Sequence, residues 1–515
     1  MTEPGRNGRT TRRRLLAVAG IGLPALALSG CAGMGGLGGR DPFTLGVASG
    51  EPGGDGFVIW TRLAPDGTAL ADPVAVDWVV AEDERLTRIA AQGRFTATAD
   101  DAHSVHVEVR SLLPDRWYWY RFTAAGAASP VGRARTMPVP GVAMQRLSLA
   151  LASCHRWEQG YYAAWRDVAA SGDDLVLFTG DYIYERTAQR GVVRQTTLTE
   201  AVDLAGYRAR YALYKRDPQL QAAHAACPWI VTWDDHEVSN DYAGNVSETR
   251  ADPDRFRARR AAAYRAFWEH MPLSPFRRPV GADMSLYRAF AFGDLVALQV
   301  LDDRQYRDPQ PCPRPGRAGS RVVAAADCGE LGDPARTMLG PSQEAWLAAQ
   351  LRRSTTRWNL VTQQTLVSPF NRGTAAAPRW WTDGWDGYPA ARDRMLADIA
   401  ASGAANPLIL GGDMHAFFVA DVARRPGGPL VATEVVGGSI SSLGEPMSAW
   451  APHLPANPHL RFVEPERRGY ARIVLTRAGA DITLRSVADI ANPASAVTDL
   501  ARFRVEAGRA GVLVA

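Results

Sequence analysis

Polar side chains that can bind metal or phosphate follow five apolar segments of this 515-residue sequence, at the point where each segment ends. They are Cys154 and His155; Asp181 and Tyr184; Asp234, Asp235, His236 and Asn240; Asp302, Asp303 and Arg304; and Asp413 and His415. Short apolar runs that stop at glycine or polar residues are typical of buried strands. Ligand sites in open α/β sheets lie beyond the carboxyl ends of the strands, so we expect these side chains to gather at one edge.

The residue types indicate a metal centre that acts on phosphate. Aspartate, asparagine and histidine are ligands of hard and borderline cations. A carboxylate can bridge two ions, and two ions can hold both oxygens of a displacement at phosphorus. A phenol and a thiol together favour a strongly charged, oxidisable ion over Mg²⁺, so Tyr184 and Cys154 indicate Fe³⁺. Asp413 and His415 are two residues apart, which places side chains on one face of an extended segment.

Each of these residues also has a structural explanation when it is taken alone. A cysteine at the end of an apolar strand is often a packed thiol, and a tyrosine is often a half-buried aromatic. His236 could be a core histidine. Asp302, Arg304 and Glu237 could form an ion-pair network beneath the site. The coincidence of several strand ends is what favours the metal site over these alternatives.

The elements that would position these residues fall into two domains. Residues 41–138 are rich in β-branched and aromatic segments separated by Gly, Pro and Asp, which predicts an all-β domain of the immunoglobulin or fibronectin type. Residues 145–490 alternate apolar and Ala/Arg-rich segments, which predicts an α/β domain. Its predicted strands are 146–152, 174–179, 228–233, 294–301, 358–362, 407–411, 429–436 and 471–484, the last as a hairpin. A helical piece in the tail, residues 491–515, could fold over the sheet as a lid.

Residues 1–40 carry a targeting pattern. Arg12 and Arg13 precede an apolar stretch, residues 15–28, that is too short to span a membrane, and this predicts a twin-arginine (Tat) signal. Leu-Ser-Gly-Cys at its end resembles a bacterial lipobox with Cys31 as the acylated residue. Cleavage nearby without lipid is the alternative. We therefore expect Tat-dependent export to the periplasm or cell surface, with a membrane anchor at Cys31.

The remaining cysteines and the net charge suggest ordinary roles. Cys312 and Cys328 flank a Pro/Gly-rich loop, and a disulfide is expected there outside the cytoplasm. Cys227 precedes an apolar run and is expected to be a buried thiol. The net charge of +4 is small for this length and does not indicate a nucleic-acid partner. We expect a monomer.

An ordered set of motifs, from about residue 43 to the C-terminus, resembles the PhoD-type alkaline phosphatases. The motifs include "FTLGVASGEPGGDGFVIWTRLAP", "ASCHRWEQGYYAAW", "TGDYIYE", "WDDHEVSNDY", "LDDRQYR", "GGDMHAFFVAD" and "TEVVGGSISS". The resemblance implies an immunoglobulin-like domain followed by a calcineurin-like metallophosphoesterase domain, a four-layer αββα sandwich. It also implies hydrolysis of phosphomonoesters and phosphodiesters at one Fe³⁺ and two Ca²⁺, in a site similar to that of purple acid phosphatases.

The family's ligands carry over by motif. Cys154, Asp181 and Tyr184 match the iron ligands, and Asp181 is also expected to bridge to calcium. Asp413 and His415 match the "GDxH" ligands. Asn240 matches the calcium-binding asparagine, with Asp235 and His236 nearby, and the sequence leaves open which of these three binds the ion.

The predicted mechanism is attack of a metal-activated hydroxide on phosphorus while calcium holds the phosphate oxygens. His155, His236 and Arg304 are candidates for steadying the phosphate or the leaving group, and each has a structural alternative. A phospholipase D-like phosphodiesterase on the same scaffold is an alternative function. A lipid-anchored surface binding protein with a structural metal site is an alternative of another class. The natural ester is left open.

Overall fold

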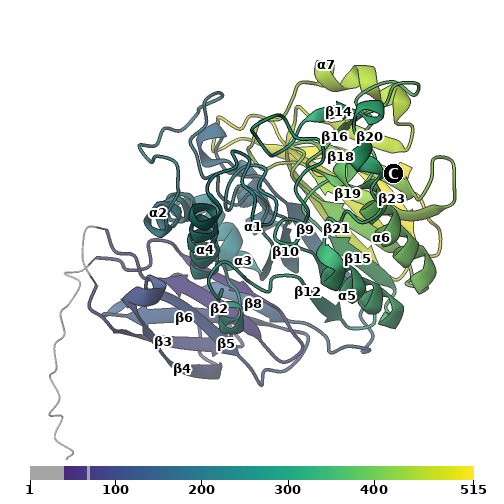
Figure 1. The fold of residues 1–515 in the computed structure, drawn as a ribbon. Helices are drawn as coiled ribbons and strands as arrows, with labels where there is room; N and C mark the ends of the chain where they lie inside the picture. The colour runs from purple at the N-terminus through teal and green to yellow at the C-terminus, as the bar shows by residue number, and fades with distance from the viewer. Residues whose placement is uncertain (1–39, 67–69, 515) are drawn as a thin grey trace, which may run out of the picture. The chain divides into compact units, whose positions relative to one another are not determined.

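A computed structural model describes residues 40–66 and 70–514 (Figure 1). The predicted export signal, with Arg12, Arg13 and Cys31, lies outside the described residues. Among the helices of the described part, none is both long and apolar enough to cross a membrane. Two large mixed sheets carry helices, so the predicted α/β class is confirmed.

The N-terminal part of the chain is built from strands. One antiparallel sheet holds β3 (Val74–Ala81), β4 (Ile89–Ala97), β6 (Arg116–Ala124), β7 (Ala127–Ala128) and β8 (Gly132–Thr136). A second layer holds β1 (Val47–Gly50), β2 (Phe57–Arg62) and β5 (Ser104–Val109). Ile59, Val76 and Tyr120 belong to the core that the two layers share. Gly50 of β1 also pairs in parallel with Trp229, so this layer continues into the main sheet.

The main sheet has ten strands in the order β24-β23-β22-β21-β9-β10-β11-β1-β2-β5. Its other members are β9 (Arg146–Ala152), β10 (Leu175–Phe178), β11 (Trp229–Val231), β21 (Arg468–Thr476), β22 (Gly479–Val487), β23 (Val497–Glu506) and β24 (Leu513–Val514). β9, β10 and β11 are parallel neighbours. Their carboxyl ends therefore lie along one edge.

A second sheet has seven strands in the order β12-β13-β15-β17-β19-β18-β20. They are β12 (Arg288–Phe292), β13 (Val296–Val300), β15 (Trp358–Thr362), β17 (Pro407–Gly411), β18 (Phe417–Ala423), β19 (Leu430–Gly437) and β20 (Leu460–Glu464). β13, β15, β17 and β19 are parallel. A two-stranded sheet joins β14 (Val322–Ala324) to β16 (Arg379–Trp381).

The two large sheets pack face to face. Leu149 and Leu177 of the ten-stranded sheet share one core with Leu360 of the seven-stranded sheet. Their sequence neighbours, such as Ala150 and Val176, point to the opposite face, as the two-residue period of a strand requires.

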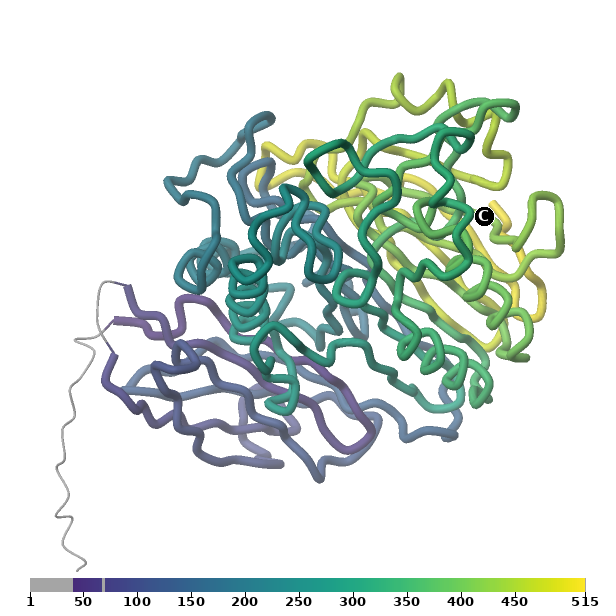
Figure 2. Tube along the Cα trace, viewed as in Figure 1, coloured from purple at the N-terminus to yellow at the C-terminus, as the bar shows by residue number. Residues whose placement is uncertain are grey.

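Helices cover the outer face of each sheet (Figures 1 and 2). α1 (Ala163–Ala170), α2 (Leu204–Lys215), α3 (Pro218–Ala226) and α4 (Pro253–His270) share a core with β9, β10 and β11. α5 (Gly340–Arg353) and α6 (Pro389–Ser402) pack on β15 and β17. α7 (Met447–Trp450) is a single short turn.

Local sequence explains where these helices begin and end. The side chains of Asp203, Asp217 and Asp252 each accept a backbone N–H bond at the start of α2, α3 and α4. Proline occupies the first position of α3 and α4, where the backbone N–H would have no partner within the helix, so its absence costs no hydrogen bond. Gly403, with φ 74°, ends α6 in the left-handed conformation that glycine tolerates.

The predicted helical lid in the tail is wrong. Residues Val497–Glu506 form β23, which pairs with β22 along its length. Phe503 and Val505 are buried in alternation with Arg502 and Arg504, so the apolar residues follow the strand period rather than the helical one. The tail therefore extends the edge of the ten-stranded sheet.

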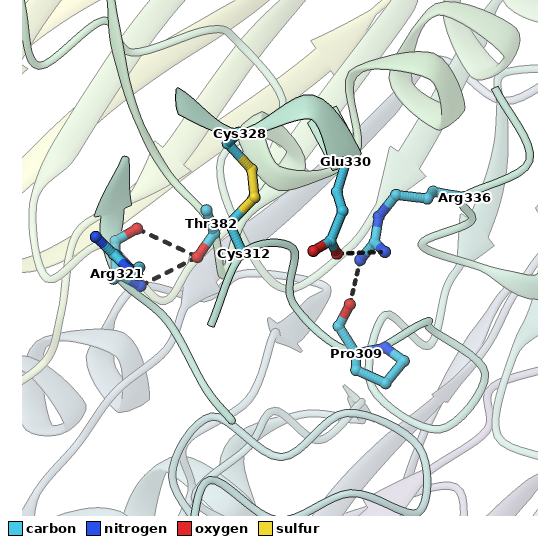
Figure 3. Close-up of a disulfide and its surroundings, with 7 residues drawn as sticks. All are labelled: Pro309, Cys312, Arg321, Cys328, Glu330, Arg336 and Thr382. Carbon is cyan, nitrogen blue, oxygen red and sulfur yellow. Dashed lines mark hydrogen bonds and ion pairs between the residues drawn. A yellow bond between two sulfur atoms is a disulfide. The ribbon is translucent and has the colours of Figure 1, made fainter. Parts of the chain in front are cut away.

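The predicted disulfide between Cys312 and Cys328 is confirmed (Figure 3). It closes a segment that contains β14. Just outside this segment, Arg336 contacts Glu330 and the Pro309 carbonyl. Closing a loop of this size stabilises a fold by about 3 kcal/mol. Cys227 is a buried free thiol, as predicted.

Candidate metal centre

The loops that follow strands of both sheets meet at one place. Ligand atoms fall into overlapping groups whose members lie within 4.8 Å of one another: Cys154, Asp181 and His415; Asp181, Asp235 and His236; and Asp234, Asp235 and Asp413. Cys154, Asp181 and Asp235 follow β9, β10 and β11, while Asp413 and His415 follow β17. The structure thus brings together side chains that are up to about 260 positions apart in the sequence, as expected from the strand ends.

Tyr184 completes the first of these groups. Its hydroxyl lies 2.8 Å from Asp181 Oδ2, 3.0 Å from His415 Nε2 and 2.7 Å from Ser442 Oγ. His415 Nδ1 lies 2.8 Å from the Leu443 carbonyl, so its Nε2 is the nitrogen that faces the group. A thiol, a phenol, an imidazole and a carboxylate therefore surround one point.

Four of these residues have left-handed backbone conformations, which are unfavourable for residues other than glycine. The φ angles of Cys154, Asp181, Asp413 and His415 are 55°, 58°, 60° and 52°. Such conformations cost of order 1 kcal/mol or more each and concentrate at functional sites. The left-handed turns also show that Asp413 and His415 do not lie on one face of an extended segment. Instead they belong to two different neighbouring groups.

Four carboxylates at this centre each have a buried oxygen that forms no hydrogen bond. Asp181 Oδ1, Asp234 Oδ2, Asp235 Oδ1 and Asp413 Oδ2 lack a hydrogen-bond partner. Buried polar atoms are normally paired, because an unpaired one costs about 1–3 kcal/mol. Asp235 Oδ1 also has the guanidinium of Arg304 at 3.8 Å, but none of the four oxygens is used in a hydrogen bond, so all four are available to bind cations.

The electrostatics of the centre also fit bound cations. Burial raises the pKa values of Asp234, Asp235 and Asp413, with neighbouring carboxylates adding to the effect and Arg304 opposing it. Burial also raises the pKa of the Cys154 thiol. One guanidinium does not balance this many acids, and a coordinated cation would favour the charged form of each.

Comparison with known proteins places these residues in a family. The profile of the PhoD-like phosphatases matches residues 149–484, and that of the PhoD-like phosphatase N-terminal domain matches residues 31–138. The chain belongs to the PhoD-like phosphatase family. It is 40% identical over 486 residues to alkaline phosphatase D of Bacillus subtilis (strain 168), covering 92% of this chain and 82% of that protein. The solved structure "Structure of PhoD" is similar to this one with a TM-score of 0.88 and 39% identity, covering 92% of each chain.

In this PhoD-like phosphatase, His236 forms a pair with a residue that the sequence analysis missed. His236 Nδ1 lies 2.6 Å from Glu185 Oε2, and the Glu185 carboxylate is buried. Burial lowers the pKa of His236, but the charges of Glu185, Asp235 and Asp181 outweigh it and raise that pKa to about 10. The side chains of His236 and His415 are 13% and 24% exposed, so the centre opens to solvent at these two imidazoles.

The predicted contact of His155 with phosphate or the leaving group is wrong. His155 is fully buried, with its ring close to those of Tyr162, Phe178 and Tyr182. Its Nδ1 accepts a bond from Trp165 Nε1 and its Nε2 lies 2.5 Å from the Tyr182 carbonyl, so no ring nitrogen is left for a ligand. Burial lowers its pKa to about 3, which keeps the ring neutral. His155 is a core histidine.

Arg304 lies in an ion-pair network, although its acidic partners are not the Asp302 and Glu237 that the sequence suggested, and the predicted direct contact with phosphate does not fit. Its fully buried guanidinium pairs with Asp234 and, at 2.8 Å, with Asp383 Oδ2. Arg307 pairs with Asp383 as well. Asp383 lies within 4.8 Å of ligand atoms of Asp235 and Asp241, but these two guanidinium groups already balance its charge. Arg304 therefore supports the carboxylates from beneath.

Asn240 lies next to the His236–Glu185 pair. Its backbone N–H donates to Glu185 Oε1 at 3.1 Å, and its side-chain amide donates to Glu248 Oε2 at 3.3 Å. Its assignment as a calcium ligand stays a prediction. Glu185 itself could have been noticed in the sequence, because it lies only four residues beyond Asp181 in the same loop.

Proposed function

We propose that this protein is a PhoD-type alkaline phosphatase that hydrolyses phosphate monoesters and diesters at the centre around Asp181. The main support is the convergence of buried carboxylates with unpaired oxygens in a chain of the PhoD-like phosphatase family. The packed sheets with helices on both outer faces then correspond to a calcineurin-like metallophosphoesterase domain.

The residues present suit a mixed set of cations. Cys154, Asp181, Tyr184 and His415 would hold one Fe³⁺, because thiolate and phenolate ligands suit a strongly charged oxidisable ion. The oxygens of Asp181, Asp235, Asp413 and Asn240 would hold two Ca²⁺, which binds oxygen ligands. When bound, such cations polarise phosphoryl oxygens and lower the pKa of a water molecule.

The protein's own groups supply proton transfer and charge balance. The Glu185 carboxylate accepts the Nδ1–H of His236, which leaves Nε2 as the proton donor toward a leaving oxygen at the open side of the centre. Arg304 offsets part of the acidic charge and keeps Asp234 in place. Ser442, bonded to Tyr184 and to the Cys154 carbonyl, orients two of the iron ligands.

Metal removal tests this proposal. Wild-type protein is expected to hydrolyse 4-nitrophenyl phosphate and bis(4-nitrophenyl) phosphate and to show a visible charge-transfer band. Prolonged EDTA treatment is expected to abolish the hydrolysis, because the cations supply Lewis acidity. It is also expected to remove the visible band, because the band arises from the bound Fe³⁺. Comparing the rate on a phospholipid with the rate on 4-nitrophenyl phosphate distinguishes a phospholipase D-like enzyme from an alkaline phosphatase. A purified protein with full metal content and no activity on any ester would instead favour a binding protein.

Paired variants show whether the band arises at the predicted ligands. Tyr184→Phe and Cys154→Ser are expected to lose or shift it. Tyr182→Phe and Cys227→Ser are matched controls, since the Tyr182 hydroxyl bonds His224 and the buried Cys227 belongs to none of the groups of candidate ligands. A fully active, colourless wild-type protein would exclude iron.

We propose in addition that residues 1–40 direct Tat export and that Cys31 carries the lipid anchor. The support is the order of paired arginines, short apolar stretch and lipobox-like ending. Cys31→Ser is expected to shift the protein from the membrane fraction to the soluble fraction of exported protein. Mass spectrometry of the mature N-terminus checks the lipid, and an unmodified N-terminus at another residue would contradict the anchor.

A further inference from the structure

One buried carboxylate, that of Glu237, joins two of the loops that carry the candidate ligands. Glu237 Oε2 accepts the backbone N–H of Asp181 at 3.1 Å and that of Asp234 at 2.7 Å. Glu237 Oε1 accepts the backbone N–H of Tyr182. The strands that precede these residues, β10 and β11, have already ended at Phe178 and Val231, so the three amides lie beyond the strand ladder.

The same loops touch closely where Glu237 holds them. A Cβ atom on Gly180, whose φ is 114°, would lie 2.5 Å from Asp234 Cβ, so only glycine fits. The Gly180 and Asp181 carbonyls in turn accept the backbone N–H groups of Cys154 and His155. Loops after β9, β10 and β11 thus form one hydrogen-bonded unit, in which Glu237 joins the loop after β10 to the loop after β11.

We propose that Glu237 is a positioning residue that fixes the backbone of Asp181 and Asp234, so that the Asp181 carboxylate faces the cations and Asp234 stays beside Asp235 and Asp413. The inference rests on the proposed function, because it takes Asp181 as a metal ligand. Asp181 has a φ of 58°, a conformation that a free loop would leave, and the Glu237 bond to its N–H restrains it there. Groups that orient metal ligands in this way typically change metal affinity about 10- to 100-fold when they are removed.

The substitution that tests this is Glu237→Gln. A glutamine amide has one oxygen and one NH₂ group where glutamate has two acceptor oxygens, so at least one of the three buried N–H groups loses its acceptor. We expect Glu237→Gln to fold, to bind Ca²⁺ and iron about 10- to 100-fold more weakly, and to show a shifted or weaker visible band. Metal titration and absorption spectroscopy measure these changes independently of turnover.

Glu434→Gln is the matched control. Glu434 is also a fully buried carboxylate, and it accepts the backbone N–H groups of Val367 and Ser368, both at 2.7 Å, away from the acidic groups. We expect Glu434→Gln to lose stability while its metal affinity and visible band stay at wild-type values. Equal metal affinity in wild type and both variants would overturn the proposal, since Glu237 would then serve folding alone.

A second variant covers the case in which Glu237→Gln fails to fold. Glu237→Asp keeps the two acceptor oxygens but shortens the side chain by one methylene, so we expect an intermediate loss of metal affinity. Wild-type affinity in folded Glu237→Asp together with an unfolded glutamine variant would also overturn the proposal. Failure of the proposed function is distinct, because wild-type protein would then itself lack bound metal or esterase activity.

Discussion

Asp181→Ala is expected to abolish hydrolysis of phosphate esters while the domain still folds. Asp181 is the residue that belongs both to the group around Cys154 and His415 and to the group around Asp235 and His236. On the proposed assignment, its removal takes a ligand from two cation positions. A loss of about 4 kcal/mol of transition-state stabilisation lowers kcat/KM about a thousandfold, and we expect at least this effect. Asp413→Ala is expected to act similarly through the Asp234–Asp235–Asp413 group.

The fold is expected to survive because the Tyr184 hydroxyl, which donates to Asp181 Oδ2, also lies within hydrogen-bond distance of Ser442 Oγ and His415 Nε2. Its Oδ1 has no hydrogen-bond partner, so the substitution breaks no bond at that atom. Asp174→Asn is the control, since Asp174 lies at the opposite end of β10 and accepts bonds from Ser148. Steady-state kinetics, metal analysis and thermal unfolding of wild type, Asp181→Ala, Asp413→Ala and Asp174→Asn test this prediction. Full activity of Asp181→Ala would contradict the assignment.

The strands that hold the site could be predicted because they are buried on both faces and therefore read as apolar runs. Residues 146–152, 358–362 and 407–411 match β9, β15 and β17 residue by residue. The prediction of a helix in the tail failed because the sequence there is amphipathic and fits either a helix or a strand. β23 mixes Arg502 and Arg504 with Phe503 and Val505, and its pairing with β22 is a tertiary property that the local pattern does not contain. The pairing of β1 with β11 is likewise a tertiary property that the local pattern does not contain.

The convergence at the candidate site was predictable for a different reason. Parallel strands place their carboxyl ends together, so Cys154, Asp181 and Asp413 could be grouped before any distance was known. The direction of each side chain was not predictable. His155 follows Cys154 directly yet turns into the aromatic core, and Glu237 follows His236 yet turns back to the loop amides. These outcomes depend on which neighbours offer hydrogen bonds, which one sequence does not show.

His236→Ala is expected to give the second large effect, and its size should depend on the leaving group. If His236 donates a proton from Nε2, an alkyl phosphate with a basic leaving oxygen needs that proton more than 4-nitrophenyl phosphate does. General-acid catalysis contributes about 10²- to 10⁴-fold, so we expect a loss in this range for the alkyl ester and a smaller one for the aryl ester. Glu185→Gln is expected to follow the same trend with smaller losses, because Glu185 orients Nδ1.

A leaving-group series separates this role from a purely structural one. A plot of log kcat/KM against leaving-group pKa is expected to be shallow for wild type and steeper for His236→Ala, because uncompensated charge then develops on the leaving oxygen. His459→Ala is the control, since His459 bonds the Pro369 carbonyl and belongs to none of the groups of candidate metal ligands. A loss of equal size across the series, with reduced metal content, would make His236 a metal ligand rather than the acid.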